Sequence, residues 1–229
     1  MVVLSINKYY WRKGGSEAVF FEEKRLLEQN GHRVIPFSMQ SEINKESEFD
    51  GCFVSTIDYD SNGVTAKAVA AGRVIFSLEA RAKMGKLLRD HAPDVAHFHI
   101  FQHQISPSVF GPLRKRGIPL VLTLHDLKPM CPNYRMYVKG HVCEACKGRR
   151  FYNCVTNRCT KDSRLKSFVN MVEMYLHYAL GHYQNVERYI APSVFIAYKM
   201  IEYGFEPTQV EYLPNFVDAQ ELQPMWRDE

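Results

Sequence analysis

Five of the six cysteines lie in one short stretch of this 229-residue sequence: Cys131, Cys143, Cys146, Cys154 and Cys159. Clustered thiols in a cytosolic protein favour a metal site over disulfides. The two-residue spacing of Cys143 and Cys146 lets both thiolates reach one tetrahedral ion, and we expect Cys154 and Cys159 to supply the other two ligands. Cys131 and His141 are the substitutes. We therefore expect a structural zinc ion; an iron-sulfur cluster is less favoured, and unbound thiols or adventitious disulfides are the remaining interpretation.

A histidine and an aspartate follow the most apolar segment of the sequence. Residues 118–124 are almost continuously apolar, as expected of a strand buried on both faces of a parallel sheet, and His125 and Asp126 come next. Polar groups at the end of such a strand lie at the crevice where open α/β sheets bind ligands. A histidine there can hydrogen-bond a ligand hydroxyl. The structural alternative is a buried histidine satisfied by Asp126 or by the backbone.

Two further groups of residues have the chemistry of a binding site. Gly14, Gly15 and Ser16 lie between an expected strand and an expected helix, where bare amides and the helix dipole favour a phosphate. Ser16 is also a candidate N-cap, and simple turn geometry is the alternative explanation for the glycine pair. His97 and His99 share one face of an expected strand. Roles in a binding pocket or in the core are favoured for them over a metal site with His103.

The elements that must position these residues alternate along the chain. Apolar and β-branched runs predict strands at 2–6, 34–37, 94–99, 118–124, 188–191 and 209–213, with a further short one at 52–55. Helical spacing predicts helices at 16–30, 66–90, 106–116, 165–183 and 193–203. This alternation is typical of a doubly wound, mostly parallel, Rossmann-like α/β sheet, with a cysteine-rich insertion at about 131–162. Most apolar residues of the helix 165–183 are expected in the core.

Composition and charge restrict the class of protein. Hydrophobic residues make up 46% and charged residues 24%, as in ordinary globular domains. The first residues are too short an apolar run for a signal peptide, and no stretch has the roughly 20 apolar residues that span a bilayer, so a cytoplasmic protein is expected. The net charge is +4, and one basic stretch suits phosphate, nucleic acid or anionic lipid unless it is a solvated loop: Lys147, Arg149, Arg150, Arg158, Lys161, Arg164 and Lys166.

Five motifs in order resemble the N-terminal domain of family-4 glycosyltransferases, which have the GT-B fold. They are Gly14-Gly15-Ser16-Glu17 with Leu26-Leu27 and Gly31-His32-Arg33-Val34, Pro93 to His99, Pro119 to Asp126, Ala191-Pro192-Ser193, and Tyr212 to Asp218. Each motif is short, but together they cover nearly the whole chain and lie on the expected elements. The resemblance implies retaining transfer of a sugar, of the hexosyltransferase type, from a nucleotide-sugar donor to a sugar or lipid-linked acceptor.

The resemblance also implies roles for particular residues. It places Gly14, Gly15 and Ser16 at the donor diphosphate, His125 as the catalytic residue beside the transferred sugar, and His99 and Asp126 on the acceptor side. No catalytic metal is expected. Polysaccharide or glycolipid biosynthesis is the implied pathway, and a peripheral position at the inner face of the membrane suits an acceptor carried on lipid.

The domain organisation follows from the same resemblance. Residues 1–213 form one Rossmann-like acceptor-side domain, with the cysteine-rich insertion as a lid over the acceptor pocket, and residues 214–229 begin an interdomain linker. The missing C-terminal domain is expected to carry the donor-binding motif, so these 229 residues alone should be inactive. A zinc-containing nucleic-acid-binding or regulatory module is the competing function, but it leaves Gly14, Gly15 and His125 without a role.

Overall fold

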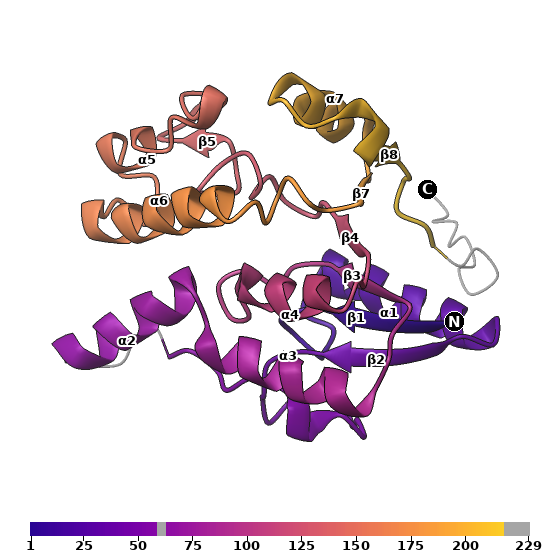
Figure 1. Cartoon of the computed structure of the whole chain (residues 1–229). Helices are drawn as coiled ribbons and strands as arrows, with labels where there is room; N and C mark the ends of the chain where they lie inside the picture. Colours follow the sequence, from indigo (N-terminus) through magenta and orange to yellow (C-terminus); the bar gives the residue numbers. More distant parts are fainter. Residues whose placement is uncertain (59–62, 218–229) are drawn as a thin grey trace, which may run out of the picture.

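A single parallel sheet organises the chain, and the computed structural model describes residues 1–58 and 63–217. The strands are β1 (Val2–Ile6), β2 (Arg33–Phe37), β3 (Val95–Phe98), β4 (Leu120–Thr123), β7 (Arg188–Ala191) and β8 (Val210–Tyr212). Their order is β2-β1-β3-β4-β7-β8, and every neighbouring pair is parallel (Figure 1). The carboxyl ends of all six strands therefore lie at the same edge of the sheet.

The connections between the strands are mostly helical. The α-helices are α1 (Gly15–Gln29), α2 (Val64–Ile75), α3 (Leu78–Asp90), α4 (Phe110–Lys115), α5 (Asn153–Thr156), α6 (Arg164–Ala179) and α7 (Val194–Glu202). Short 3-10 turns lie at η1 (Asp50–Cys52), η2 (Pro107–Val109), η3 (Lys147–Arg149) and η4 (Pro207–Gln209). Strands β5 (Tyr137–Val138) and β6 (His141–Val142) form a separate antiparallel pair.

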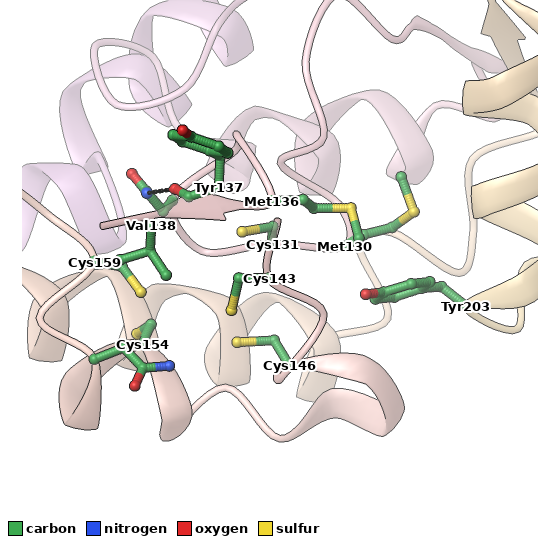
Figure 2. A pocket seen from close by; sticks show the side chains of 12 residues that line it. Met130, Cys131, Met136, Tyr137, Val138, Cys143, Cys146, Cys154, Cys159 and Tyr203 are labelled. Atoms are coloured by element: carbon green, nitrogen blue, oxygen red, sulfur yellow. Dashed lines mark hydrogen bonds between the residues drawn. The ribbon is translucent and has the colours of Figure 1, made fainter. Parts of the chain in front are cut away.

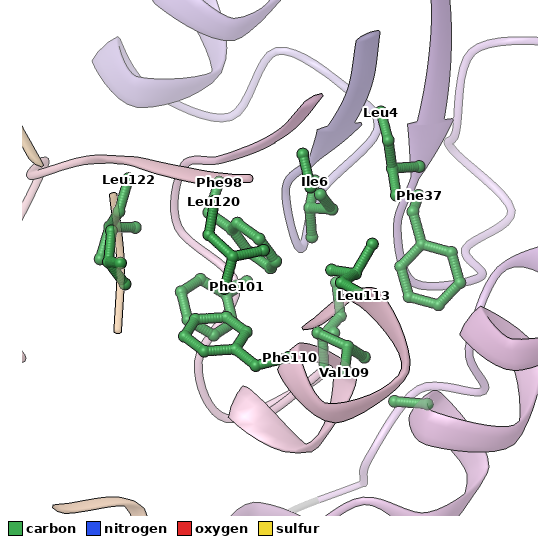
Figure 3. Close-up of a cluster of buried hydrophobic side chains, with 14 of the residues drawn as sticks. Leu4, Ile6, Phe37, Phe98, Phe101, Val109, Phe110, Leu113, Leu120 and Leu122 are labelled. Atoms are coloured by element: carbon green, nitrogen blue, oxygen red, sulfur yellow. The ribbon is translucent and has the colours of Figure 1, made fainter. Parts of the chain in front are cut away.

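Phe98, the last residue of β3, and His99, which follows it, show that both faces of the sheet are covered. The ring of Phe98 lies 4.7 Å from that of Phe110 in α4, whereas the ring of His99 lies 5.3 Å from that of Phe20 in α1. On the α4 side, Leu4 and Ile6 of β1 and Phe98 of the adjacent β3 belong to a fully buried apolar cluster (Figure 3). The predicted doubly wound α/β fold is confirmed.

Three predictions about individual elements are wrong: one helix, one strand and one N-cap. The predicted helix 66–90 is two helices, because the hydroxyl of Ser77 accepts a hydrogen bond from the amide of Ala80 at 3.1 Å and starts α3 anew. The predicted strand 52–55 is one parallel bridge between Val54 and Met39. Ser16 does not cap α1; Gly14 occupies the N-cap without a side-chain bond.

Helix α6 reverses the expected arrangement of polar and apolar residues. Its buried side carries Ser167, Asn170, Glu173, Met174 and His177, and of these five only the methionine is apolar. The large apolar side chains Leu165, Phe168 and Tyr175 are 74%, 50% and 40% exposed. The prediction that most apolar residues of this helix lie in the core is therefore wrong. None of the described helices has the length and apolar content that crossing a bilayer requires.

Two expectations concern the ends of the domain. Residues 214–217 continue beyond β8 without regular structure, and residues 218–229 of the predicted linker lie outside the described residues. The division into a domain of residues 1–213 and a linker stays a prediction.

Candidate functional site

A cleft of about 610 Å³ lies at the carboxyl edge of the sheet. Its walls come from the loops that follow β1, β3 and β4, from the start of α7 and from two residues of the cysteine-rich segment. The lining residues are Lys8, Ile100, Gln102, His103, His125, Asp126, Leu127, Lys128, Tyr134, Arg135, Ser193, Phe195 and Ile196. This is the place where open α/β sheets bind ligands. The predicted site residues His125 and Asp126 both line it.

His125 presents one free ring nitrogen to this cleft. Its Nε2 lies 3.0 Å from Nδ1 of His99, and its Nδ1 makes no hydrogen bond to any residue that the structure describes. Burial lowers the pKa of His125 to about 4, and the neighbouring His97 adds to this effect. The imidazole is therefore neutral at physiological pH and available for hydrogen bonding.

A buried hydrogen-bonded network lies behind His125. Nδ1 of His97 lies 2.5 Å from Oε1 of Glu23, and its Nε2 lies 2.8 Å from the hydroxyl of Thr123. His99 is buried, and burial holds its pKa well below the usual range. Nε2 of His99 has no hydrogen-bond partner among the described residues and lies 3.8 Å from Oε2 of Glu23. The predicted acceptor-side residue His99 thus supports His125 from behind instead of lining the cleft.

The Glu23, His97 and His99 side chains also have the composition of a metal site. Among the described residues they form a group whose potential ligand atoms lie within 4.8 Å of one another. Both ring nitrogens of His97 are already engaged by Glu23 and Thr123, so protein contacts hold these side chains together. The prediction favoured core or pocket roles for these histidines, but it missed Glu23, which lies one helical turn after the buried Phe20 and so faces the sheet.

A buried ion pair closes the floor of the cleft. The ammonium group of Lys128 is 2.6 Å from Oε2 of Glu173, and it also contacts Nε2 of His103 at 3.1 Å and the carbonyl of Pro132 at 3.2 Å. Lys128 is 1% exposed and Glu173 is fully buried. Neither residue was predicted to belong to the site, although Glu173 is the one acidic residue of α6.

Opposite charges control the ionisation of this floor. Burial alone raises the pKa of Glu173, but Lys128 and His103 more than offset burial and lower the pKa to about 2. Burial raises the pKa of Asp126, although the backbone amide of Lys128, which donates to its Oδ1 at 2.9 Å, acts in the opposite direction. Because its pKa is about 2, Glu173 is ionised at physiological pH.

The glycine loop lies outside the lining of the cleft. Gly14 and Gly15 are exposed at the start of α1. The extended φ of −163° at Gly14 suits any residue, and a Cβ at Gly15 would meet nothing within 4 Å. Turn geometry therefore does not explain this pair. The hydroxyl of Ser16 donates to Oε1 of Glu17 at 3.0 Å, and the charge of Glu17 acts on His125, so the loop is electrostatically connected to the cleft.

The predicted metal ligands line a separate small cavity. Cys143, Cys146, Cys154 and Cys159 surround it together with the substitute Cys131 (Figure 2). All six cysteines of the chain are free thiols. The segment that carries them also contributes Tyr134 and Arg135 to the cleft.

The model of a family described as Glycosyltransferase Family 4 matches residues 13–221. One similar solved structure is UDP-N-acetylglucosamine 2-epimerase from Rickettsia bellii, with 11% sequence identity and a TM-score of 0.45. That alignment covers 92% of this chain and 43% of the epimerase chain, so the present chain spans less than half of its length. A search of curated protein sequences gave no match.

Replacing Glu173 with glutamine should destabilise the protein by about 3–5 kcal/mol, because the substitution leaves the Lys128 charge buried without its counterion. The pH dependence should also change. The pKa of Glu173 is lowered, so its contribution to stability is complete above about pH 4.5 and is lost as the pH falls towards about 2. The free energy of unfolding of the wild type should fall in that interval, and that of Glu173→Gln should fall less. Urea titrations at several pH values measure both.

The double variant Lys128→Met with Glu173→Leu is the matched control. It removes both charges and keeps the buried volume, so we expect a cost well below that of Glu173→Gln. Equal stability of Glu173→Gln and the wild type would contradict the prediction.

Proposed function

The chain belongs to glycosyltransferase family 4, and we propose that its cleft is the acceptor side of a site for retaining transfer of a sugar from a nucleotide-sugar donor. The observation that carries the proposal is the position of His125. It lies two residues after the end of β4, lines the cleft and keeps one ring nitrogen free, within a chain that matches the family over residues 13–221. A hexose and a sugar or lipid-linked acceptor are the proposed substrates.

The network behind His125 determines which nitrogen carries its proton. Glu23 accepts a hydrogen bond from Nδ1 of His97, and its second oxygen faces Nε2 of His99. A proton on that nitrogen is favoured by the carboxylate, which leaves Nδ1 of His99 to accept a hydrogen bond from Nε2 of His125. Nδ1 of His125 is then unprotonated. It accepts a hydrogen bond from a substrate hydroxyl and orients that hydroxyl for transfer.

The glycine loop supplies the proposed contact with the donor diphosphate. Gly14 and Gly15 leave the first amides of α1 uncovered, and Ser16 adds a hydroxyl. Amides at a helix start stabilise the negative charge that develops on a leaving nucleoside diphosphate. Neither backbone conformation nor packing accounts for glycine at Gly15, which supports a role in close approach of a ligand.

Turnover is proposed to need a second domain. The resemblance of the motifs places the remaining contacts with the donor in a C-terminal domain, across a cleft from the residues described here. We expect the 229-residue chain alone to give no multiple turnover. The linker-like stretch from 214 onwards is the proposed connection.

An exposed apolar stripe on α6 supports a peripheral position at a membrane. Leu165, Phe168 and Tyr175 are exposed and, with the half-buried Val172, follow the helical repeat on the side opposite to the buried polar residues. Basic residues adjoin the stripe at the helix start and just before it: Arg158, Lys161, Arg164 and Lys166. Apolar residues beside basic ones are typical of helices that rest on anionic lipid. This surface would bring the cleft close to a lipid-linked acceptor.

Replacing His125 with alanine in the protein that includes the second domain should lower kcat by about 10²–10⁴-fold, because the substrate hydroxyl loses its hydrogen-bond acceptor. Release of nucleoside diphosphate from a panel of nucleotide-sugars measures the effect. His32→Ala, far from the cleft, is the control and should keep wild-type activity. Unchanged kcat in His125→Ala would contradict the role of His125, and multiple turnovers by the 229 residues alone would contradict the need for a second domain.

Replacing Glu23 with glutamine should reduce kcat by up to about 100-fold with little change in KM, because the proton of His99 and the orientation of His125 are no longer fixed. The pKa of His125 is about 4, so wild-type kcat should be constant above about pH 5 and should fall as the pH decreases through 4. Steady-state kinetics across pH test both statements. Restoration of activity by Glu23→Asp would separate a positioning role from mere loss of stability, and a wild-type profile in Glu23→Gln would overturn the role of Glu23.

The double substitution Leu165→Ser with Phe168→Ser should weaken binding to anionic lipid vesicles by about tenfold or more. Two apolar side chains that become partly buried in the lipid contribute at least about 1.5 kcal/mol to binding. Cosedimentation with phosphatidylglycerol vesicles measures the change. Ile43→Ser is the matched control, because Ile43 is 63% exposed but lies in the loop after β2. Equal vesicle binding by the double variant and the wild type would exclude the stripe as the contact surface.

A further inference from the structure

The cysteine-rich segment brings five thiols around one small cavity. Cys131 follows the loop after β4, Cys143 follows β6, Cys146 precedes the η3 turn, Cys154 lies in α5 and Cys159 follows α5; all of them line the cavity (Figure 2). The volume of the cavity is about 10 Å³, which is enough for about one atom or ion. Converging thiols around a space of this size are the donor set of a structural metal site.

The backbone of this segment is strained. Among the described residues, eight residues other than glycine have a positive φ, and seven of them lie between 134 and 162: Tyr134, Met136, Lys139, Arg149, Arg158, Lys161 and Asp162. Each such conformation costs on the order of 1–3 kcal/mol and persists only where other interactions enforce it. The regular secondary structure of this segment consists of two strands of two residues each, the η3 turn and the four-residue helix α5. A bound ion that joins several turns would supply the missing stabilisation.

We propose that the segment holds one structural zinc ion through Cys131, Cys143, Cys146 and Cys159, with Cys154 outside the ligand set. Cys131 lines the same cavity as Cys143, Cys146 and Cys159 (Figure 2). This position favours Cys131 as a ligand instead of a substitute.

Cys154 differs from the other four thiols in its partner. Its sulfur donates a hydrogen bond to the carbonyl of Ser167 at 3.2 Å, which joins α5 to the buried side of α6. It is also 1% exposed, the most buried cysteine of the segment. A thiol that keeps its proton to hold a carbonyl is not a thiolate ligand. The four remaining thiols match the number that tetrahedral zinc requires.

Zinc binding would bring the four sulfurs closer together. In residues 1–58 and 63–217, the groups of ligand atoms within 4.8 Å of one another do not include these cysteines. Zinc, with bonds of about 2.3 Å, would draw the four sulfurs to about 3.8 Å from one another.

The ion would fix the rim of the cleft. Cys131 lies three residues before Tyr134 and four before Arg135, both of which line the cleft, and its amide donates to the carbonyl of Leu127 at 2.9 Å. The metal site itself is independent of the proposed transferase function. Its effect on acceptor binding rests on that function.

Metal analysis of the full chain, purified without chelator, tests the proposal directly. We expect about one zinc ion per chain in the wild type and in Cys154→Ser, whose hydroxyl still donates to Ser167. We expect loss of zinc in Cys131→Ser and in Cys146→Ser. Absence of metal in the wild type would overturn the site. Detection of iron with acid-labile sulfide would overturn the zinc site in favour of an iron-sulfur cluster. Loss of zinc in Cys154→Ser together with retention of zinc in Cys131→Ser would overturn the assignment of ligands.

Cobalt replacement keeps the test decisive if the cysteine variants do not fold. Wild-type protein exchanged with Co²⁺ should show thiolate-to-cobalt charge-transfer absorption and the visible bands of a tetrahedral site with four thiolates. Chelator should remove these bands and lower the Tm of the wild type and of Cys154→Ser alike. A cobalt spectrum without thiolate bands, or a Tm that does not respond to chelator, would contradict the proposal. Neither readout depends on transferase activity.

Discussion

The ion pair between Lys128 and Glu173 fixes how helix α6 packs against the loop that follows β4. Neither charge can be buried alone, and at 2.6 Å each provides the partner that the other requires. The pair joins the loop after β4 to the middle of α6, across 45 residues of sequence. It therefore decides which side of α6 faces the protein.

The same constraint explains the reversed polarity of α6. Around Glu173, the buried side of the helix is filled by polar groups that find polar partners: Asn170 donates to the carbonyl of Pro132, and His177 lies 2.9 Å from Nδ1 of His182. Once polar contacts hold this side, the large side chains of Leu165, Phe168 and Tyr175 face outwards. An apolar stripe in water is unfavourable, and this is the physical basis of the proposed membrane contact.

The regular parts of the fold were predictable because they depend on local pattern. All six strands of the sheet and the shared face of His97 and His99 follow from apolar runs and strand alternation. The break before α3 was missed because it depends on one side-chain bond of Ser77, and the orientation of α6 because the apolar pattern pointed to the opposite side. The partners of His125 were only half predicted. Its position at the end of β4 is local, but Glu23 acts on it from a different helix.

One run of eleven residues, 125–135, carries most of the chemistry of the chain. It begins with the neutral His125, passes through Asp126 and the buried Lys128, and ends beside Cys131 at the two cleft residues Tyr134 and Arg135. The run has no regular secondary structure, so its shape depends on side-chain anchors at both ends. The histidine network and the ion pair hold one end, and the cysteine cavity holds the other. A site built on such a loop keeps its geometry only while each anchor is intact, which explains why strained backbone and buried charge are concentrated around it.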